Sequence, residues 1–325
     1  MNVRRRYVVL ALCFVLAGIV LLGPRAEVGA YRGFPDLGPD VEAYLEASEA
    51  AIPDLRPGDG KRIVWTNSAT SGRTRLALVY LHGFTADPHE VEPLMTNLGR
   101  AMGANVYFAR LAGHGRAPAA LGEVEASDWL VDAGEAMAIG RRIGERVVLV
   151  GTSTGGTLAA WAAMRPDFQQ DLAALVLLSP NFHPRDSRSR LLLWPWGGII
   201  ARLVEGDERC FETHGASHAR HWTECHPTRA LLPMMALVEE VRTSDLGRLE
   251  VPTMVVYVPG DEVVDADATV DAYARIGSAR KRLVAVDGTG DPDAHVPAGE
   301  ILSPGTTLLV EEEVRRFVED VAGPH

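Results

Sequence analysis

A serine flanked by glycines lies between an apolar run and a stretch of small residues. From Val147 the sequence reads VVLVGTSTGG and continues with TLAA. An apolar strand, a tight glycine-flanked turn and a helix would together hold the Ser153 hydroxyl exposed above a sheet. The helix would offer the backbone N–H of Thr154 to a developing oxyanion. We therefore expect Ser153 to be a nucleophile, the alternative being a structural serine in a turn.

A second motif lies upstream, where Leu78 to Thr85 read LVYLHGFT. A strand that ends in His-Gly can turn sharply and direct the next backbone N–H, that of Phe84, at the same oxyanion. His82 precedes the serine in the chain, so we interpret it as a residue that holds the loop and not as the base.

These two motifs, together with Gly113-His114-Gly115-Arg116, resemble the α/β-hydrolase superfamily and, within it, the carboxylesterase and monoacylglycerol-lipase-like group. The resemblance extends from Arg62 to the C-terminus. In that superfamily the acid follows the penultimate strand and the base follows the last strand.

The resemblance implies Asp261 as the acid, after the strand expected at Thr253 to Val258, with Glu262 and Asp265 as alternatives. It implies His295 as the base, since His295 is the only histidine in the loop after the last expected strand. Ser153, Asp261 and His295 would then form a catalytic triad.

The chemistry follows from the residue types. A serine hydroxyl becomes nucleophilic when an imidazole takes its proton, and a carboxylate orients that imidazole. The resemblance implies hydrolysis of a small-molecule or lipid carboxylic ester with an apolar acyl chain, without metal or cofactor. Acyltransferase, thioesterase and amidase or peptidase chemistry use the same triad. A membrane-tethered, non-catalytic binding protein is the alternative from another class.

Strand-length apolar runs alternate with helical patterns after residue 61, which indicates a mainly parallel sheet covered by helices on both faces. We expect a single α/β-hydrolase domain over residues 62–325. The expected strands are Arg62–Thr66, Leu76–Leu81, Asn105–Ala109, Val147–Val150, Leu172–Leu178, Thr253–Val258 and Arg282–Val286. The expected helices are Glu90–Met102, Ser127–Ile143, Gly156–Met164, Leu231–Thr243, Ala266–Ile276 and Glu311–Ala322.

A long segment interrupts this alternation at about residues 181–228, far beyond the usual two to six residues of a strand-to-helix connection. Its apolar portions favour a cap over a cleft, and a small helical subdomain is the alternative. The residues expected to line the cleft are Leu192, Leu193, Trp194, Trp196 and Phe211.

The same insertion carries Cys210 and Cys225, for which a disulfide and two free thiols are equally compatible with the spacing. Four histidines lie nearby, but their spacing matches no zinc-finger pattern, so we favour a disulfide over a metal site. They are His214, His218, His221 and His226.

The N-terminus differs from the rest of the chain. Arg4, Arg5 and Arg6 precede an uncharged apolar run from Tyr7 to Gly23, as in an export signal. We expect residues 1–24 to be a signal anchor or signal peptide, with a buried core helix as the alternative. Residues 25–61 would be a linker and edge segment. The protein would be exported, facing the periplasm or exterior from a membrane, or secreted after cleavage.

The net charge of -11 argues against nucleic acid as a partner, because a phosphate backbone requires a basic surface. The oligomeric state does not follow from the sequence.

Overall fold

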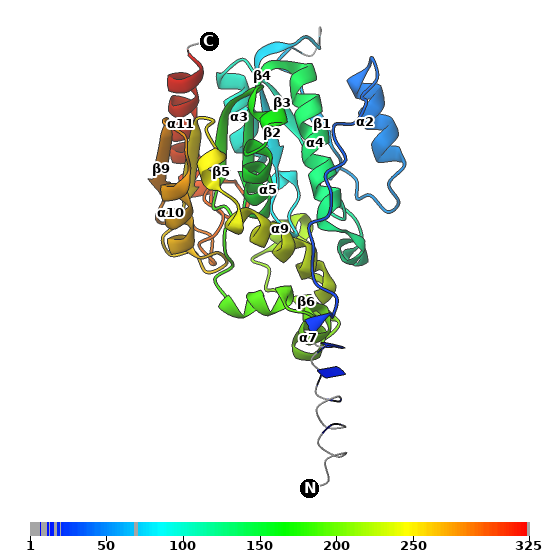
Figure 1. The fold of residues 1–325 in the computed structure, drawn as a ribbon. Coiled ribbons are helices and arrows are strands. Elements are labelled where there is room, and N and C mark those ends of the chain that lie inside the picture. The colour runs from blue at the N-terminus through cyan, green and yellow to red at the C-terminus, as the bar shows by residue number, and fades with distance from the viewer. Residues whose placement is uncertain are drawn as a thin grey trace.

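One sheet organises the described part of the chain (Figure 1), with the strand order β1-β3-β2-β4-β5-β8-β9. The structure is a computed structural model that describes Tyr7, Leu12 and residues 14–15, 18–19, 21–67 and 71–323. Strand β1 is antiparallel to β3, and the other neighbouring pairs are parallel. The strands are β1 (Arg62–Val64), β2 (Thr74–Leu81), β3 (Asn105–Phe108), β4 (Gly144–Thr152), β5 (Leu172–Leu178), β8 (Thr253–Tyr257) and β9 (Lys281–Ala285).

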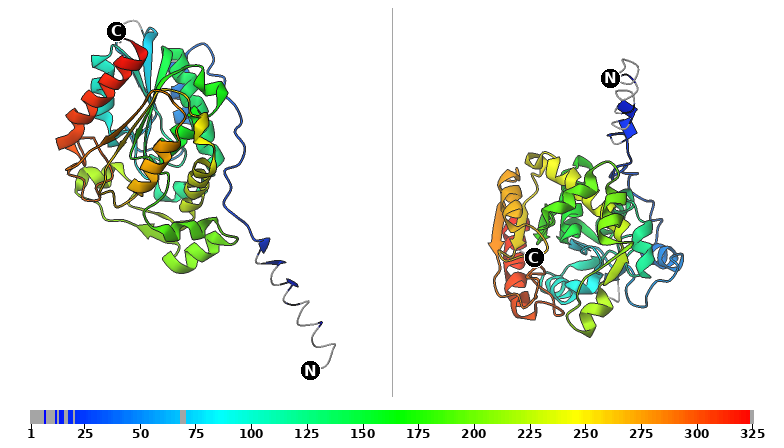
Figure 2. Two further views of the ribbon diagram at one scale, coloured as in Figure 1. Left: turned by 60° about the vertical axis from the view of Figure 1, so that its left-hand side comes forward. Right: turned by 90° about the horizontal axis from the view of Figure 1, so that it is seen from below.

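Helices cover both faces of the sheet (Figure 2). Along β2, Ala77, Val79 and Leu81 pack against one face, while alternate residues such as Leu78 and Tyr80 pack against the other. The first face carries α4 (Ala126–Ile143), α5 (Thr154–Ala163), α9 (Leu231–Thr243) and α10 (Ala266–Arg275), and the second carries α3 (Glu92–Ala101) and α11 (Pro304–Ala322). This arrangement confirms the predicted α/β-hydrolase architecture.

The last helix begins earlier than predicted. We expected Glu311 as its start, but α11 begins at Pro304. Proline is favoured at the first helical position, where its missing N–H is not needed. The hydroxyls of Thr306 and Thr307 donate to backbone carbonyls, which lets these polar residues occupy the first turn without apolar periodicity.

The segment before the sheet packs across the helices. Tyr31 lies against Trp161 of α5, with ring centroids 5.4 Å apart, and against Phe168 of the short helix α6 (Pro166–Gln169). The chain then forms α2 (Val41–Ala50), which Asp40 caps through two backbone N–H groups. Glu49 at its end accepts two hydrogen bonds from the buried Arg110 guanidinium. These contacts fix residues 25–61 against the sheet domain.

About half of the predicted apolar segment Tyr7–Gly23 lies outside the described residues. Among the residues that are described, no helix has the length and apolar character needed to cross a membrane. The end of this segment contacts the insertion. The indole of Trp196 donates to the carbonyl of Ile19, and the Trp196 N–H donates to that of Pro24.

The insertion between β5 and α9 lies beyond the carboxyl ends of the parallel strands (Figures 1 and 2). It contains α7 (Gly197–Glu205), α8 (Ala216–His221) and a hairpin of β6 (Glu208–Cys210) and β7 (Cys225–Pro227), with the 3-10 helices η3 (Ser187–Leu193) and η4 (Thr228–Ala230). Cys210 and Cys225 pair across the hairpin and form a disulfide. Of the two states that the sequence left open, the structure contains the disulfide.

We expect the variant Cys210→Ala/Cys225→Ala to lose about 3 kcal/mol of unfolding free energy, because the cross-link constrains a loop of about 15 residues in the unfolded chain. Denaturant titrations of the wild type with and without reductant measure this loss. Cys13→Ala is the matched control and should unfold like the wild type. Equal stability of oxidised and reduced wild-type protein would contradict the prediction.

Candidate active site

Ser153 lies on the turn between β4 and α5, at φ 52° and ψ −119°. This left-handed conformation is costly for a residue with a side chain and persists where the surrounding structure enforces it. A Cβ on Gly155 would lie 2.2 Å from the carbonyl oxygen of Leu81, and one on Gly151 would lie 2.4 Å from that of Gly155. The glycines therefore allow strand, turn and helix to approach closely enough to raise the serine above the sheet.

Gly155→Ala should destabilise the protein by about 3 kcal/mol or more, because the new methyl group would collide with backbone atoms that cannot rotate away. Chemical denaturation measures the change. Gly305→Ala in the first turn of α11 is the matched control, since its Cβ would meet nothing within 4 Å. The control should be neutral or slightly stabilising. An equally stable Gly155→Ala protein would show that the turn is not constrained as described.

Asp261 and His295 form a buried pair. The Nδ1 of His295 donates to Oδ2 of Asp261 at 2.8 Å, and the other carboxylate oxygen accepts the backbone N–H groups of Val263 and Val264. These hydrogen bonds fix the orientation of the Asp261 carboxylate toward His295. The two alternative candidates for the acid have other partners. Glu262 is exposed and pairs with Arg185, and Asp265 caps α10.

Burial on its own lowers the pKa of His295, but the charge and hydrogen bond of Asp261 outweigh burial and raise it above the usual 6.5. The charges of Asp291 and Glu90 act in the same direction. A proton on this imidazole is therefore stabilised, as a general base that must accept a proton requires.

Ser153 and His295 line the same pocket, although no hydrogen bond joins the two side chains among the described residues. Such bonds are often long before a substrate is bound. Since Asp261 fixes Nδ1, the free ring nitrogen of His295 is Nε2. The structure thus brings all three predicted residues to one site, with the Asp–His contact formed and the Ser–His contact open.

The predicted oxyanion donors border the same pocket. Phe84 and Thr154 both line it, and the N–H groups of these residues have no acceptor in the described part of the chain. A Cβ on Gly83 would lie 3.4 Å from the Cβ of Ser153, so the Gly83–Phe84 loop passes directly beside the serine. These donors are available for an anionic oxygen.

His82 holds this loop in place, as its position before the serine suggested. Its Nε2 accepts the N–H of Leu111, so Nδ1 carries the proton and donates to the carbonyl of Gly83. Burial lowers the pKa of His82 to about 4, which keeps the ring neutral.

Glu90, which no sequence motif marks as functional, is a buried carboxyl in the wall of the pocket. Its Oε2 accepts the N–H of Gly83 at 2.8 Å and the hydroxyl of Tyr80 at 2.7 Å. Tyr80 also lies 2.8 Å from the hydroxyl of Thr152, directly before the serine. Burial raises the pKa of Glu90 to about 7, and the two hydrogen bonds act against that rise. Glu90 thus connects the oxyanion loop to the serine turn.

Glu90→Gln keeps an acceptor for Gly83 and Tyr80, so its kcat should stay near that of the wild type. Glu90→Leu leaves both donors unpaired, which should cost about 1–3 kcal/mol of stability. Its kcat should fall as Phe84 is misplaced, by no more than the about 100–1,000-fold loss of an oxyanion donor. Steady-state kinetics beside thermal unfolding separate the two effects. Equal kcat values for the two variants would refute a positioning role.

Asp291 is a second residue without a sequence signal strong enough to identify it. Its Oδ2 accepts the backbone N–H groups of His295 and Val296, and its Oδ1 accepts that of Asp293. Ala294 adopts φ 51° within this loop. An aspartate that bonds to following N–H groups is a common turn pattern, which is why its role required the structure.

The pocket has a volume of about 470 Å³, within the range typical of small-molecule sites. Cap residues Leu192 and Phe211 line it as expected, but Leu193, Trp194 and Trp196 do not. Trp196 adopts a left-handed conformation at the start of α7 and packs against Gly23 instead. The insertion and α9 contribute apolar lining residues that include Leu191, Leu192, Ile200, Ala201, Val204, Phe211, Trp222, Leu231 and Met234.

The histidines of the insertion do not form one cluster with the cysteines. The disulfide removes both thiolates as ligands, so the histidine–cysteine site that we considered is not formed. His214 and His218 lie side by side, with ring centroids 5.7 Å apart, whereas His221 contacts Asp87 of the core.

A mainly parallel sheet, a serine on a left-handed turn after a central strand and a buried Asp–His pair define an α/β-hydrolase. Residues 72–290 match the family described as serine aminopeptidase, S33 (Hydrolase_4), and the chain belongs to that family. The match includes Ser153 and Asp261 and ends before His295.

Individual relatives are lipases and esterases. The thermostable monoacylglycerol lipase of Bacillus sp. (strain H-257) is 23% identical over 209 residues, covering 64% of this chain and 80% of the lipase. A structure of the metagenome-derived lipolytic enzymes LipS and LipT matches with a TM-score of 0.64 at 22% identity, covering 82% and 99% of the two chains. Saccharomyces cerevisiae monoglyceride lipase matches with a TM-score of 0.61 at 13% identity, covering 82% and 92%. The protein is therefore a lipase- and esterase-like α/β-hydrolase.

Proposed function

We propose that the protein is a serine esterase that cleaves carboxylic esters with an apolar acyl chain. One observation carries the proposal, namely that Ser153 lines a pocket under apolar cap residues together with His295, whose ring is hydrogen-bonded to Asp261. The similarity to a monoacylglycerol lipase supports a lipid-like ester as substrate.

In the proposed reaction, the Oγ of Ser153 attacks the acyl carbonyl carbon while Nε2 of His295 takes the hydroxyl proton. The N–H groups of Phe84 and Thr154 bind the oxyanion of the tetrahedral intermediate. The intermediate collapses as His295 returns the proton to the leaving alcohol, which yields an acyl-enzyme. Water, deprotonated by His295, then releases the acid and restores Ser153.

A p-nitrophenyl ester series from acetate to palmitate tests this proposal. Each added methylene should raise kcat/KM by about fourfold until the pocket is full, because burying one methylene is worth about 0.8 kcal/mol. The p-nitroanilide and the thioester that carry the best acyl chain are assayed in parallel. A further assay contains an added alcohol, whose acylation would reveal acyl transfer. Turnover of the anilide without turnover of any ester would replace the esterase proposal by a peptidase one.

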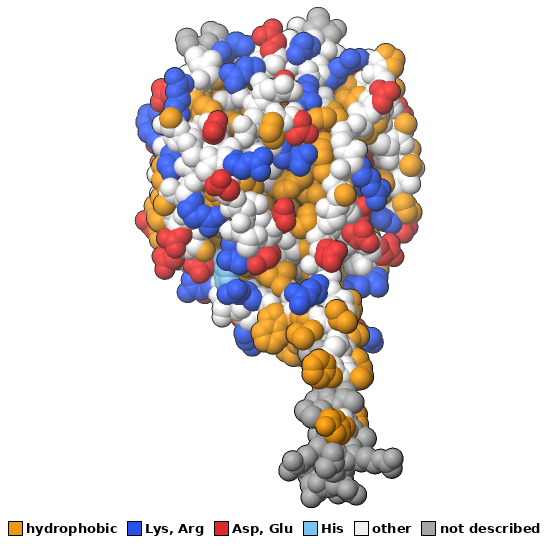
Figure 3. Space-filling model, viewed as in Figure 1, with side chains coloured by type: hydrophobic (Ala, Val, Ile, Leu, Met, Phe, Trp, Pro, Cys, Tyr) orange, Lys and Arg blue, Asp and Glu red, His pale blue; other side chains and the backbone are white. Residues whose placement is uncertain are grey.

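The N-terminal pattern supports a location for this activity, namely export with attachment to a membrane through residues 1–24, or secretion after cleavage. Exposed apolar side chains gather at the cap end of the molecule in Figure 3. Trp194, Leu203 and Val204 of the cap are all exposed. Fractionation of cells that express the full chain or a chain without residues 1–25 tests the proposal. The full chain should stay with carbonate-washed membranes, or appear outside the cell in shortened form. A full-length product in the cytoplasm would contradict both membrane attachment and secretion.

A further inference from the structure

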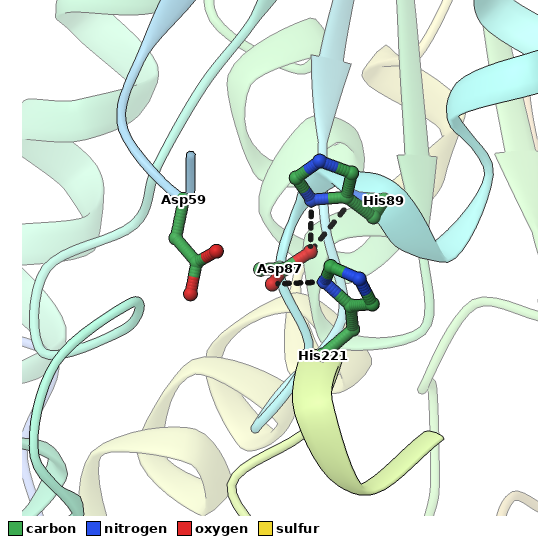
Figure 4. Close-up of side chains that lie close together, drawn as sticks. All are labelled: Asp59, Asp87, His89 and His221. Carbon is green, nitrogen blue, oxygen red and sulfur yellow. Dashed lines mark hydrogen bonds and ion pairs between the residues drawn. The ribbon is translucent and has the colours of Figure 1, made fainter. Parts of the chain in front are cut away.

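Two aspartates and two histidines converge beside the oxyanion loop (Figure 4). They are Asp59, Asp87, His89 and His221, and one ligand atom from each lies within 4.8 Å of every other. Asp87 and His89 follow β2 at the 3-10 helix η1 (Pro88–Glu90), Asp59 comes from the segment before the sheet, and His221 ends α8 of the cap. Three separate parts of the chain thus meet at one point.

Asp87 is the centre of this group. Its Oδ1 lies 2.9 Å from Nδ1 of His89, and its Oδ2 lies 2.9 Å from Nδ1 of His221. The two imidazole rings face each other with centroids 4.3 Å apart. Both rings therefore present the same nitrogen to one carboxylate.

The charges in this group are unusual for a buried position. The carboxylates of Asp59 and Asp87 are both fully buried, and a buried carboxylate requires compensation. Asp59 contacts the guanidinium groups of Arg56 and Arg220. Asp87 has no arginine or lysine partner among the described residues, and its partners are the rings of His89 and His221 and the backbone N–H of His89. A cation bound beside Asp87 would compensate the charge of this buried carboxylate.

We propose that Asp59, Asp87, His89 and His221 form a binding site for a divalent transition metal ion, with zinc as the best fit. Imidazole nitrogens and carboxylate oxygens are the donors that zinc accepts, at about 2.0–2.2 Å. Tetrahedral ligands at that distance are about 3.4 Å from each other. Each Nδ1 lies 2.9 Å from Asp87, so each ring needs to move only a short way from the carboxylate when the ion takes the place of the proton between them.

The surroundings of His89 support this assignment. Metal-bound histidines commonly donate their second ring N–H to a carboxylate, which fixes the tautomer. The Nε2 of His89 lies 3.4 Å from Oε2 of Glu92, and Glu92 is itself paired with Arg62. If Nδ1 binds the metal, Nε2 carries the proton, and a small movement would bring it within hydrogen-bond distance of Glu92.

In the absence of a metal ion, the guanidinium group of Arg220 provides the positive charge beside Asp59. One of its nitrogens lies 2.9 Å from Oδ1 of Asp59, yet that oxygen has no hydrogen bond of acceptable geometry among the described residues. The Arg220 side chain is 42% exposed, so it can move into solvent when a metal ion binds. Arg220 and the metal ion should therefore compete for Asp59.

The site joins the cap to the core. His221 belongs to the cap, while Asp87 and His89 directly follow the Gly83–Thr85 loop. Close by, the N–H of Thr223 donates to the carbonyl of Thr85. A bound ion would thus fasten α8 beside the loop that carries Phe84.

The test uses the full chain, stripped of metal with a chelator and titrated with Zn²⁺ in competition with a chromogenic chelator. We expect one equivalent to bind, and Co²⁺ to give visible absorption typical of nitrogen and oxygen ligands. His89→Ala and His221→Ala, which alter partly exposed side chains, should each weaken binding by more than about tenfold. Glu92→Gln should weaken it by about tenfold, as loss of an outer partner does.

Arg220→Gln separates a metal site from an ordinary ion-pair network, because it should tighten Zn²⁺ binding while lowering stability without metal. His214→Ala is the matched control from the same cap and should bind like the wild type. Circular dichroism shows which variants fold. If His89→Ala does not fold, His89→Gln replaces it. The proposal is overturned if the wild type binds no Zn²⁺, if His214→Ala loses binding as His221→Ala does, or if Arg220→Gln weakens binding.

Discussion

Ser153→Ala should lower kcat for the best ester by about a million-fold, as removal of the nucleophile does in serine hydrolases. The hydroxyl oxygen of Ser153 is the atom that forms the acyl bond, and the left-handed turn is what raises it above the sheet. The remaining rate would come from the pocket and the N–H groups of Phe84 and Thr154. Initial rates at high enzyme concentration, with labelling by a fluorophosphonate, measure the effect.

Ser179→Ala is the matched control for this change. Ser179 is buried at the end of the neighbouring strand β5, and its hydroxyl has no partner among the described residues. This variant should keep wild-type activity and labelling. Ester turnover by Ser153→Ala at more than a small fraction of the wild-type rate would remove Ser153 from the mechanism.

Asp261→Asn should lower kcat by about ten-thousand-fold, because an amide in this place favours the wrong tautomer of the histidine. It should also change the pH profile. Asp261 raises the pKa of His295, and His295 acts as a base only when it is deprotonated. The acid limb of kcat/KM should therefore lie above pH 6.5 in the wild type and move to lower pH in the variant.

Asp265→Asn is the control, since Asp265 caps α10 and asparagine caps helices equally well. It should change neither kcat nor the pH limb. Asp265 is also an alternative candidate for the acid, so the two variants together test which aspartate has that role. A large loss in Asp265→Asn with little loss in Asp261→Asn would transfer the role to Asp265.

The central strands and the serine turn could be predicted from sequence because their signals are local. The run before Gly151 is apolar on both faces, as a buried parallel strand requires, and the glycines around Ser153 mark the turn. The acid and base came from their order along the chain, after a resemblance had identified the family. Spacing alone would not have distinguished Asp261 from Glu262.

The remaining features depend on contacts between distant segments. Glu90 follows an ordinary loop in the sequence, and only folding places its carboxyl against Gly83 and Tyr80. The path of the cap was equally hidden, because apolar side chains such as Trp196 can pack into a cleft or against another segment. The sequence shows that such residues are apolar but not which partner they contact.

The two ends of the described chain lie at opposite ends of the molecule (Figures 1 and 2). Ile19 and Pro24 contact Trp196 in the cap, whereas α11 ends far from it, beside Arg75 at the start of β2. For immobilisation on a chip or bead, attachment through the C-terminus would therefore leave the pocket facing the solution. Attachment through the N-terminus would turn the pocket toward the support, and large substrates would be hindered.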